Sequence, residues 1–340
     1  MRRTRRRVVA SLLSLGVIAS LVSSAPIARA ERRDDADRID HAIAYLAAQQ
    51  RPNGSIPAFS PIGSTADAVL AFVAAGVGED QLHEALGFLR RSVAHGKADS
   101  VGFQAKIVTA VVAAGGDPRS FGGLDLVQAI VDSLGAHGRF DKAAVFDDAL
   151  AVIALVAAGQ TVPDATVQWL VDAQCADGGW QYNKPASAND DEHCHNTLRP
   201  TKDFFDSDTN TTSYVMQAIE AAGGSTFTAD PFAFFAEIRD AQRHGWGYTW
   251  GFQTTDANST ALVIQAYAAT GTPVPADALA ALRKLQNPTC GGWSFTWSGS
   301  QRTDPDPGST IGAILGLLQR PLPLVPGAVV GSAAPVPACG

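Results

Sequence analysis

The sequence predicts an all-α protein in which six inner and six outer helices alternate along the chain and close into a ring, an (α/α)6 toroid. Three observations lead to this prediction: an apolar helix type that recurs, amphipathic segments between its copies, and a turn signature that joins the two. Recurrence at intervals of about 20 to 50 residues is typical of repeat architectures, in which each unit buries its apolar face against its neighbours.

The recurring helix is apolar nearly all round and ends in small residues followed by glycine. Its copies are Ala66–Gly76, Ala105–Gly115, Ala149–Gly159, Ser213–Gly223 and Ala261–Gly271, with a degenerate sixth copy at Ile311–Pro321. A helix without a polar face is a buried one, and the closing glycine fits the residue that stops a helix. We expect these six segments to form the inner layer.

Amphipathic segments alternate with the apolar ones. They are Arg38–Gln50, Asp80–Val93, Leu126–Leu134, Pro163–Gln174, Pro231–Gln242 and Pro275–Gln286. Each carries charge on one face, so we expect them to form the outer layer. An open stack would leave one side of the inner helices wet, which favours a closed ring. The longest interval, between the third and fourth inner copies, predicts a polar insertion at 183–206.

A turn signature follows four outer segments: a glutamine, a short turn, glycine, and an apolar or aromatic residue. Its copies run Gln50…Gly54…Ile56, Gln174…Gly179-Trp180, Gln242…Gly245-Trp246 and Gln286…Gly292-Trp293. The glutamine amide can bond unpaired groups at a helix end, and glycine permits a reversed turn. We therefore interpret the signature as structural.

This signature resembles the QW repeat of the terpenoid cyclase and protein prenyltransferase superfamily, to which squalene-hopene cyclases belong. The resemblance covers about residues 36–320 and implies the same toroid. Class II terpene cyclases of this superfamily carry Asp-x-Asp-Asp-Thr-Ala at the mouth of an inner helix, and the middle Asp protonates an alkene.

Related segments of this chain begin at Asp208, Asp256 and Asp306, but the middle acid is replaced by Asn210, Asn258 and Gly308 respectively. An amide is no Brønsted acid towards an alkene. The resemblance therefore implies a relative that lacks this catalytic acid. Asp, Asn, Ser and Thr at these positions are also the residues that cap helix starts.

Two functions remain open. The leading hypothesis is a secreted binding or scaffold protein whose ring receives an apolar small molecule, such as an isoprenoid, or a peptide. Its candidate binding residues are Asn210, Asn258, Asp306, Tyr248, Trp250 and Trp297. The alternative is an enzyme, either a divergent terpene cyclase-like protein or a glycan-acting hydrolase or lyase, because paired carboxylates in a cleft serve glycoside hydrolysis. Its candidate carboxylates are Asp147, Asp148, Asp206, Asp208 and Asp256.

The sequence predicts no metal and no cofactor. The Asp-x-Cys pair through which prenyltransferases hold zinc does not occur, and the adjacent residues His193-Cys194-His195 are poorly spaced for one site. Residues 1–30 hold six arginines and no acid, so residues 31–340 carry 20 basic and 33 acidic groups, a net charge of −13. A surface this acidic repels phosphate backbones, which argues against nucleic acid as a partner.

Residues 1–30 have the three regions of a secretory signal peptide. A basic stretch, Arg2–Arg7, precedes a mostly apolar one, Val8–Ile27, and Ala28-Arg29-Ala30 fits a cleavage site. The basic stretch also loosely fits a twin-arginine signal. We expect an exported protein, secreted or at the cell surface or in the periplasm, with the toroid at 31–322 and a Pro/Gly/Ala-rich tail at 323–340. No later segment is long and apolar enough to span a bilayer.

Four cysteines, Cys175, Cys194, Cys290 and Cys339, would meet an oxidising compartment after export. Four cysteines allow three pairings. Proximity in the sequence favours Cys175–Cys194, at the base of the insertion, and Cys290–Cys339, which would hold the tail.

Overall fold

The computed structural model describes residues 24–135, 138–140, 144–183, 194, 206–224 and 226–339. The chain divides into two compact units, Met1–Arg38 and Ile39–Gly340, and the second contains the ring of helices. Regular structure in the described residues consists of twelve α-helices and two short antiparallel hairpins. The predicted all-α toroid is confirmed.

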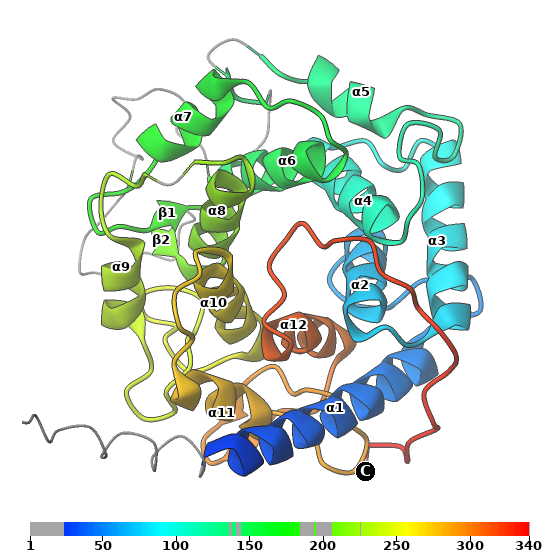
Figure 1. The fold of residues 1–340 in the computed structure, drawn as a ribbon, viewed down its shortest axis with the longest axis vertical. Coiled ribbons are helices and arrows are strands. Elements are labelled where there is room, and N and C mark those ends of the chain that lie inside the picture. Colours follow the sequence, from blue (N-terminus) through cyan, green and yellow to red (C-terminus); the bar gives the residue numbers. More distant parts are fainter. Residues whose placement is uncertain are drawn as a thin grey trace, which may run out of the picture. The chain divides into compact units, whose positions relative to one another are not determined.

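Six inner helices surround the axis of the ring (Figure 1). They are α2 (Pro61–Ala75), α4 (Val101–Ala113), α6 (Val145–Ala157), α8 (Thr209–Ala221), α10 (Ala257–Ala269) and α12 (Pro307–Leu317). Each packs against the next, and α12 packs against α2, so the ring is closed. Small residues let the backbones approach: a Cβ added at Gly316 of α12 would lie 2.6 Å from the Cα of Ala261 in α10.

Outer helices alternate with the inner ones along the chain, and from Ile39 on they surround the inner ring (Figure 1). They are α1 (Ser24–Gln49), α3 (Glu79–Ala94), α5 (Leu126–Asp132), α7 (Asp164–Asp172), α9 (Pro231–Ile238) and α11 (Ala276–Lys284). The inner helices begin about one turn before the predicted apolar runs, because their polar first turns are also helical. Several outer helices end before the predicted glutamines, which belong to the turns.

Each turn signature binds the inner helix that follows it. The backbone N–H of the apolar residue donates to a threonine Oγ1 in the first turns of that helix, at 2.9 to 3.0 Å, in the pairs Ile56–Thr65, Trp180–Thr212, Trp246–Thr260 and Trp293–Thr310. Each tryptophan Nε1 also donates to a backbone carbonyl of the preceding outer helix, at 2.7 to 2.8 Å. The signature thus joins the two layers.

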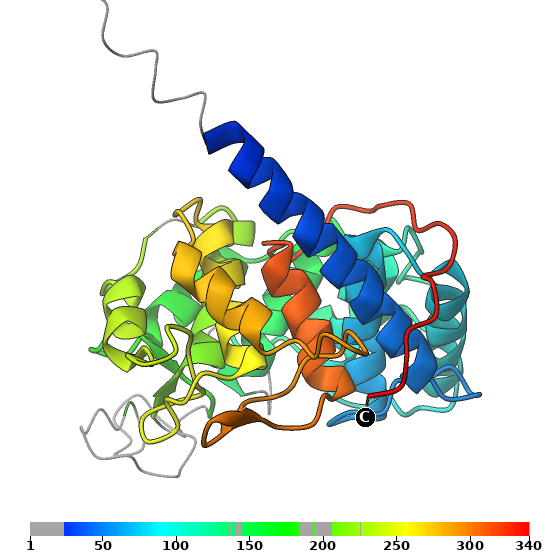
Figure 2. The same cartoon turned by 90° about the horizontal axis from the view of Figure 1, so that it is seen from below.

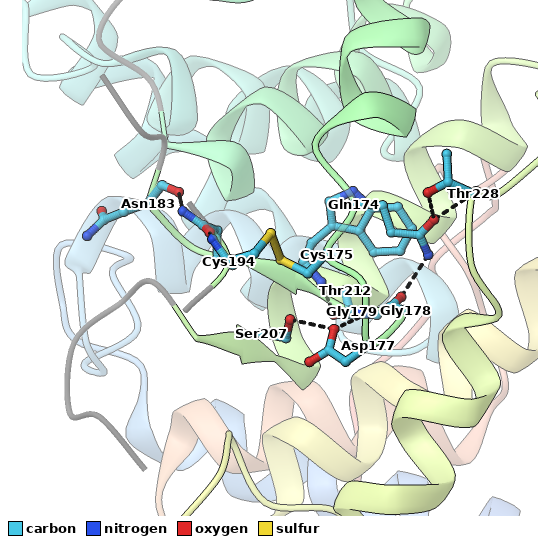
Figure 3. Close-up of a disulfide and its surroundings, with 12 residues drawn as sticks. Gln174, Cys175, Asp177, Gly178, Gly179, Asn183, Cys194, Ser207, Thr212 and Thr228 are labelled. Carbon is cyan, nitrogen blue, oxygen red and sulfur yellow. Dashed lines mark hydrogen bonds between the residues drawn. A yellow bond between two sulfur atoms is a disulfide. The ribbon is translucent and has the colours of Figure 1, made fainter. Parts of the chain in front are cut away.

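The glutamine of the signature closes the turn in three of its four copies. Figure 3 shows Gln174, whose Nε2 donates to the Gly178 carbonyl at 2.8 Å and whose Oε1 accepts from the backbone N–H of Thr228 at 2.7 Å. The third copy differs from our interpretation. Gln242 is exposed there, and Asp240 organises the turn by accepting from the backbone N–H of Thr255 at 2.8 Å.

Two hairpins and two disulfides complete the structure. β1 (Trp180–Gln181) pairs with β2 (Ser207–Asp208), and β3 (Trp297–Ser298) pairs with β4 (Gln301–Arg302); neither hairpin was predicted. The two favoured disulfides, Cys175–Cys194 (Figure 3) and Cys290–Cys339, are both present. The predicted signal peptide lies mostly outside the described residues, as do His193, His195 and most of the predicted insertion.

The C-terminal segment after α12 runs along the outside of the ring (Figure 2, red). The backbone N–H of Val330 donates to the Gly76 carbonyl at 3.1 Å, and the N–H of Gly78 donates to the Gly331 carbonyl at 3.2 Å. Nearer α12, the N–H of Leu322 donates to Gln217 Oε1 inside the ring at 2.8 Å. Among the described helices, none is both long and apolar enough to cross a membrane.

Candidate functional site

Two adjacent cavities lie at the ring and share part of their walls. The inner pocket, of about 130 Å³, has mainly apolar walls from α2, α10, α12 and the C-terminal segment; they include Leu70, Leu262, Ile311, Leu315 and Leu322. The mouth, of about 330 Å³, lies where α2, α4 and α6 begin. Phe59, Ser64 and Asp67 line both cavities, so the inner pocket and the mouth are neighbours.

Charged side chains from three successive inner helices line the mouth. Lys106 of α4 donates to Asp67 Oδ2 of α2 at 2.5 Å, and Asp147 of α6 lines the same cavity. Burial lowers the pKa of Lys106, but the charge of Asp67, with smaller contributions from Tyr214 and Asp147, outweighs burial and raises it overall. Lys106 therefore stays protonated between two carboxylates.

Asp147 lies against the adjoining helix. A Cβ added at Gly102 of α4 would collide with the Asp147 carboxylate, so a larger residue there would displace it. Burial raises the pKa of Asp147, while a hydrogen bond with the backbone of Ala144 and the charge of Lys106 oppose the rise. The structure thus places a carboxyl with a raised pKa at the wall of an open cavity.

Aromatic rings flank these charges. The ring of Phe146 lies 5.4 Å from that of Tyr182 and 4.9 Å, edge to face, from that of Tyr214. Burial raises the pKa of Tyr214 to about 12, with Lys106 opposing and Asp67 adding to the rise. Both tyrosines therefore remain neutral phenols. Rings of this kind offer apolar faces to a ligand beside hydroxyl donors.

The other two candidates in this part of the chain are buried in the protein. Asp148, next to Asp147, is fully buried, and its Oδ1 accepts from the backbone N–H of Phe140 at 3.2 Å. Consecutive residues of a helix point about 100° apart, so one carboxyl lines the mouth and the other binds the chain segment outside α6. Asp206 is buried just before β2.

The aspartates of the repeated helix-start motif are caps. Oδ1 of Asp208 accepts from the Thr211 N–H at 2.7 Å, and Oδ1 of Asp256 accepts from the Ser259 N–H at 2.7 Å. Asp306 caps α12 in the same way, at 2.9 Å. Burial raises the pKa of Asp208 and of Asp256 to about 7, although the hydrogen bonds that they accept oppose the rise.

The remaining predicted binding residues are spread over several elements. Asn258 lines the inner pocket, and Asn210 is half-buried in the first turn of α8. Burial raises the pKa of the Tyr248 phenol, and the charge of the neighbouring Asp208 raises it further. Trp250 is half-buried in a turn. The guanidinium of Arg243 lies over the ring of Trp297 in β3, with its carbon 5.5 Å from the centroid of that ring. Of the predicted residues, the structure brings Asp147 and Asn258 to the pocket described above.

Asp67, Lys106 and Tyr182 of the mouth were not predicted, and neither was Tyr214 of the inner pocket. A signal for the first two was present, because each interrupts an otherwise apolar inner segment with a charge. The repeated polar motif, which caps the helix starts, was the more conspicuous pattern in the sequence. In the part of the chain that the structure describes, no cluster of three or more His, Cys, Asp or Glu could hold a metal ion.

No family model and no curated protein sequence matches the chain. Solved structures with the same fold do. The type II terpene cyclase MstE from Scytonema has a TM-score of 0.55 at 14% identity, over 84% of this chain and 98% of that one. An α-1,6-mannanase from Salegentibacter has a TM-score of 0.57 at 10% identity, with the same coverage. An inactive variant of that mannanase, with two consecutive aspartates replaced, is in complex with α-1,6-mannotriose. At these identities the likeness shows the shared toroid fold.

Proposed function

We propose that this protein binds a small, partly apolar molecule along the axis of its ring. The observation that carries the proposal is the adjacency of the two cavities: a charged, aromatic mouth lies beside a mainly apolar inner pocket, and the two share three wall residues. In this proposal one elongated molecule spans both. Binding sites for organic molecules typically combine apolar walls with a few placed polar groups. An isoprenoid alcohol is a suitable class of ligand because its chain is apolar and its one polar end can stay at the mouth.

The mouth favours a neutral or cationic polar end. Asp67 and Asp147 supply two negative charges and Lys106 one positive charge, and the chain from residue 31 on carries a net charge of −13. An anionic end would meet repulsion in a partly buried place, where charges interact more strongly than in water. A hydroxyl can donate to either carboxylate.

The first residues of α8, α10 and α12 support a binding role without cyclase chemistry. Asn210, Asn258 and Gly308 occupy the position of the middle, catalytic Asp of the Asp-x-Asp-Asp-Thr-Ala motif. The aspartates two residues before them accept hydrogen bonds from helix N–H groups. Those aspartates are therefore already occupied as caps.

The second candidate is hydrolysis of a glycan, which two observations favour. Asp147 has a pKa raised by burial, as a general acid requires, and Asp67 lines the same mouth. The mannanase with two replaced consecutive aspartates is inactive, and Asp147-Asp148 is a consecutive pair here. Asp148, however, binds the backbone of Phe140, so Asp67 would have to be the second carboxylate.

Export of the protein is also part of the proposal. Its support is the composition of residues 1–30 together with the two disulfides, since disulfides persist in oxidising compartments. In this proposal residues 1–30 are removed on export, residues 31–322 form the toroid, and residues 323–340 form a tail bound through Cys339.

The binding proposal is tested with farnesol as the probe. The protein is produced by export from an oxidising host, and its affinity for farnesol is measured by titration. Leu262→Trp should abolish binding because the larger ring fills the inner pocket. The control is Leu279→Trp, at a half-buried position of the outer helix α11, which should bind like the unaltered protein. Saturable binding that Leu262→Trp does not reduce, or no binding at all, would reject the proposal.

The glycan alternative is tested by adding α-1,6-linked mannan and measuring released reducing sugar. Hydrolysis that Asp147→Asn abolishes and Asp148→Asn retains would favour the enzyme. No release by the unaltered protein would reject this alternative for that polysaccharide.

A further inference from the structure

Gln265 of α10 lies in the wall of the inner pocket with an unused acceptor. Its side chain is 1% exposed, and its Oε1 has no hydrogen-bond donor among the described residues. The orientation of the amide is determined, because Nε2 donates to the Ala261 carbonyl at 3.3 Å. A buried acceptor without a donor is unfavourable. The oxygen is therefore a polar point in an otherwise mainly apolar chamber.

The repeat contains the same residue in a satisfied state. Gln217 occupies in α8 the position that Gln265 occupies in α10, the fifth residue of the recurring segment. Its Nε2 likewise donates one turn back, to the Ser213 carbonyl at 3.1 Å. Its Oε1 accepts from the backbone N–H of Leu322 at 2.8 Å. At α8 the C-terminal segment supplies the donor, whereas at α10 Gln265 lines the inner pocket and its oxygen has no donor among the described residues.

We propose that Gln265 Oε1 accepts a hydrogen bond from an O–H or N–H group at the innermost end of the bound ligand. This end would be about the size of a benzene ring, since apolar cavities of about 150 Å³ bind benzene and the inner pocket measures about 130 Å³. The proposal rests on the proposed function, because it requires that the pocket takes up a ligand. It refines the ligand class: besides a polar end at the mouth, the innermost end of the apolar body carries one donor, which farnesol lacks.

Phenol and toluene test this inference because they are nearly the same size and differ in one hydroxyl group. Both are titrated into the exported protein, with calorimetry as the readout. We expect phenol to bind about fivefold more tightly than toluene, the effect of one net hydrogen bond. In Gln265→Met, which has similar volume and no amide, this preference should disappear. In the control variant Gln217→Met, which does not alter the acceptor in the pocket, it should remain.

The melting temperature without ligand is a second readout. It should change in opposite directions when Gln265 and the equivalent Gln217 are replaced by methionine. Gln265→Met should raise Tm by about 2 to 4 °C, because it replaces an unsatisfied buried amide with an apolar group. Gln217→Met should lower Tm by a similar amount, because it leaves the N–H of Leu322 buried without an acceptor. The same sign for both variants would contradict the inference.

The outcomes separate this inference from the proposed function. Equal affinities for phenol and toluene in the unaltered protein, or a preference for phenol that persists in Gln265→Met, would overturn the role of Gln265 and leave the pocket as a binding site. If farnesol binds the unaltered protein but neither phenol nor toluene does, the inference fails and the binding function stands; if farnesol does not bind either, both fail. The comparison of the two probes in the unaltered protein needs no variant, so it stands even if a substitution prevents folding.

Discussion

The inner helices of the ring use polar residues at their starts in two different ways. On one side, α8, α10 and α12 each begin after an aspartate whose carboxylate accepts from the helix N–H groups. On the other side, Ser60 and Ser100 cap α2 and α4, and no side chain caps α6. The charges there lie beyond the first turn at Asp67 and Lys106 and in the first turn of α6 at Asp147, and they line the mouth.

This difference separates a structural motif from a candidate site. A carboxylate at a cap position is occupied by the orphan N–H groups of its own helix. Asp67, beyond the first turn of α2, is paired with Lys106 instead, and Asp147 makes a hydrogen bond with the backbone of Ala144 while it lines the mouth. Polar residues that recur with the repeat therefore serve the repeat, and charges that occur once are better candidates for function.

The largest expected effect is a dependence of stability on pH, and it concerns the aspartates that cap α8 and α10. Because the pKa of Asp208 and of Asp256 is raised to about 7, the folded protein binds more protons than the unfolded chain between about pH 4 and pH 7. The free energy of unfolding should fall as the pH rises through this window, by at most roughly 4 kcal/mol for each carboxyl. The double variant Asp208→Asn, Asp256→Asn retains acceptors for capping and should flatten the profile. Urea unfolding across the window measures this, and an unchanged profile would assign the effect to other groups.

The next largest effect concerns the stability contribution of the Lys106–Asp67 pair at the mouth. Lys106→Met should lower the free energy of unfolding by about 3 kcal/mol, since it leaves Asp67 partly buried without its cation. Adding Asp67→Asn should recover most of the loss, because the uncompensated charge is removed. Urea unfolding of the two single variants and the double variant gives the coupling. Additive losses would show that the two side chains do not act as a pair.

A smaller effect is expected for Gly102→Ala, which should weaken ligand binding but hardly change stability. Gly102→Ala should displace the Asp147 carboxylate and weaken farnesol binding, by about fivefold if one hydrogen bond to the ligand is lost. The free energy of unfolding should change by less than about 1 kcal/mol, because alanine favours the helix while the contact opposes it. Gly87→Ala in the outer helix α3 is the matched control and should bind normally. A normal affinity for Gly102→Ala would argue that Asp147 does not contact the ligand.

Much of the ring was predictable because it depends on periodic apolar residues, which mark buried helices wherever they occur. The exact helix starts were harder to predict, because the hydroxyls of Thr65 and Thr212 accept hydrogen bonds from a preceding turn, a contact that no local pattern shows. The short hairpins also went unpredicted, since two-residue strands leave no periodic pattern.

The candidate site was only partly predictable. Asp147 and Asp148 are adjacent and chemically identical, and only packing against Gly102 and Phe140 decides which carboxyl faces the cavity. Asp67 and Lys106 lie 39 residues apart. Their pairing depends on the contact between α2 and α4, which follows from closure of the ring rather than from either segment alone.

The measurement that most directly tests the contrast between the two sides is urea unfolding of Asp147→Ala and Asp256→Ala, with and without saturating farnesol. We predict that Asp256→Ala loses about 1 to 2 kcal/mol of intrinsic stability, as expected for a missing cap, and keeps the stabilisation that farnesol gives the unaltered protein. Asp147→Ala should keep its intrinsic stability and lose most of the gain from farnesol. The reverse pattern, or equal losses in both variants, would contradict the division of the ring into a structural side and a binding side.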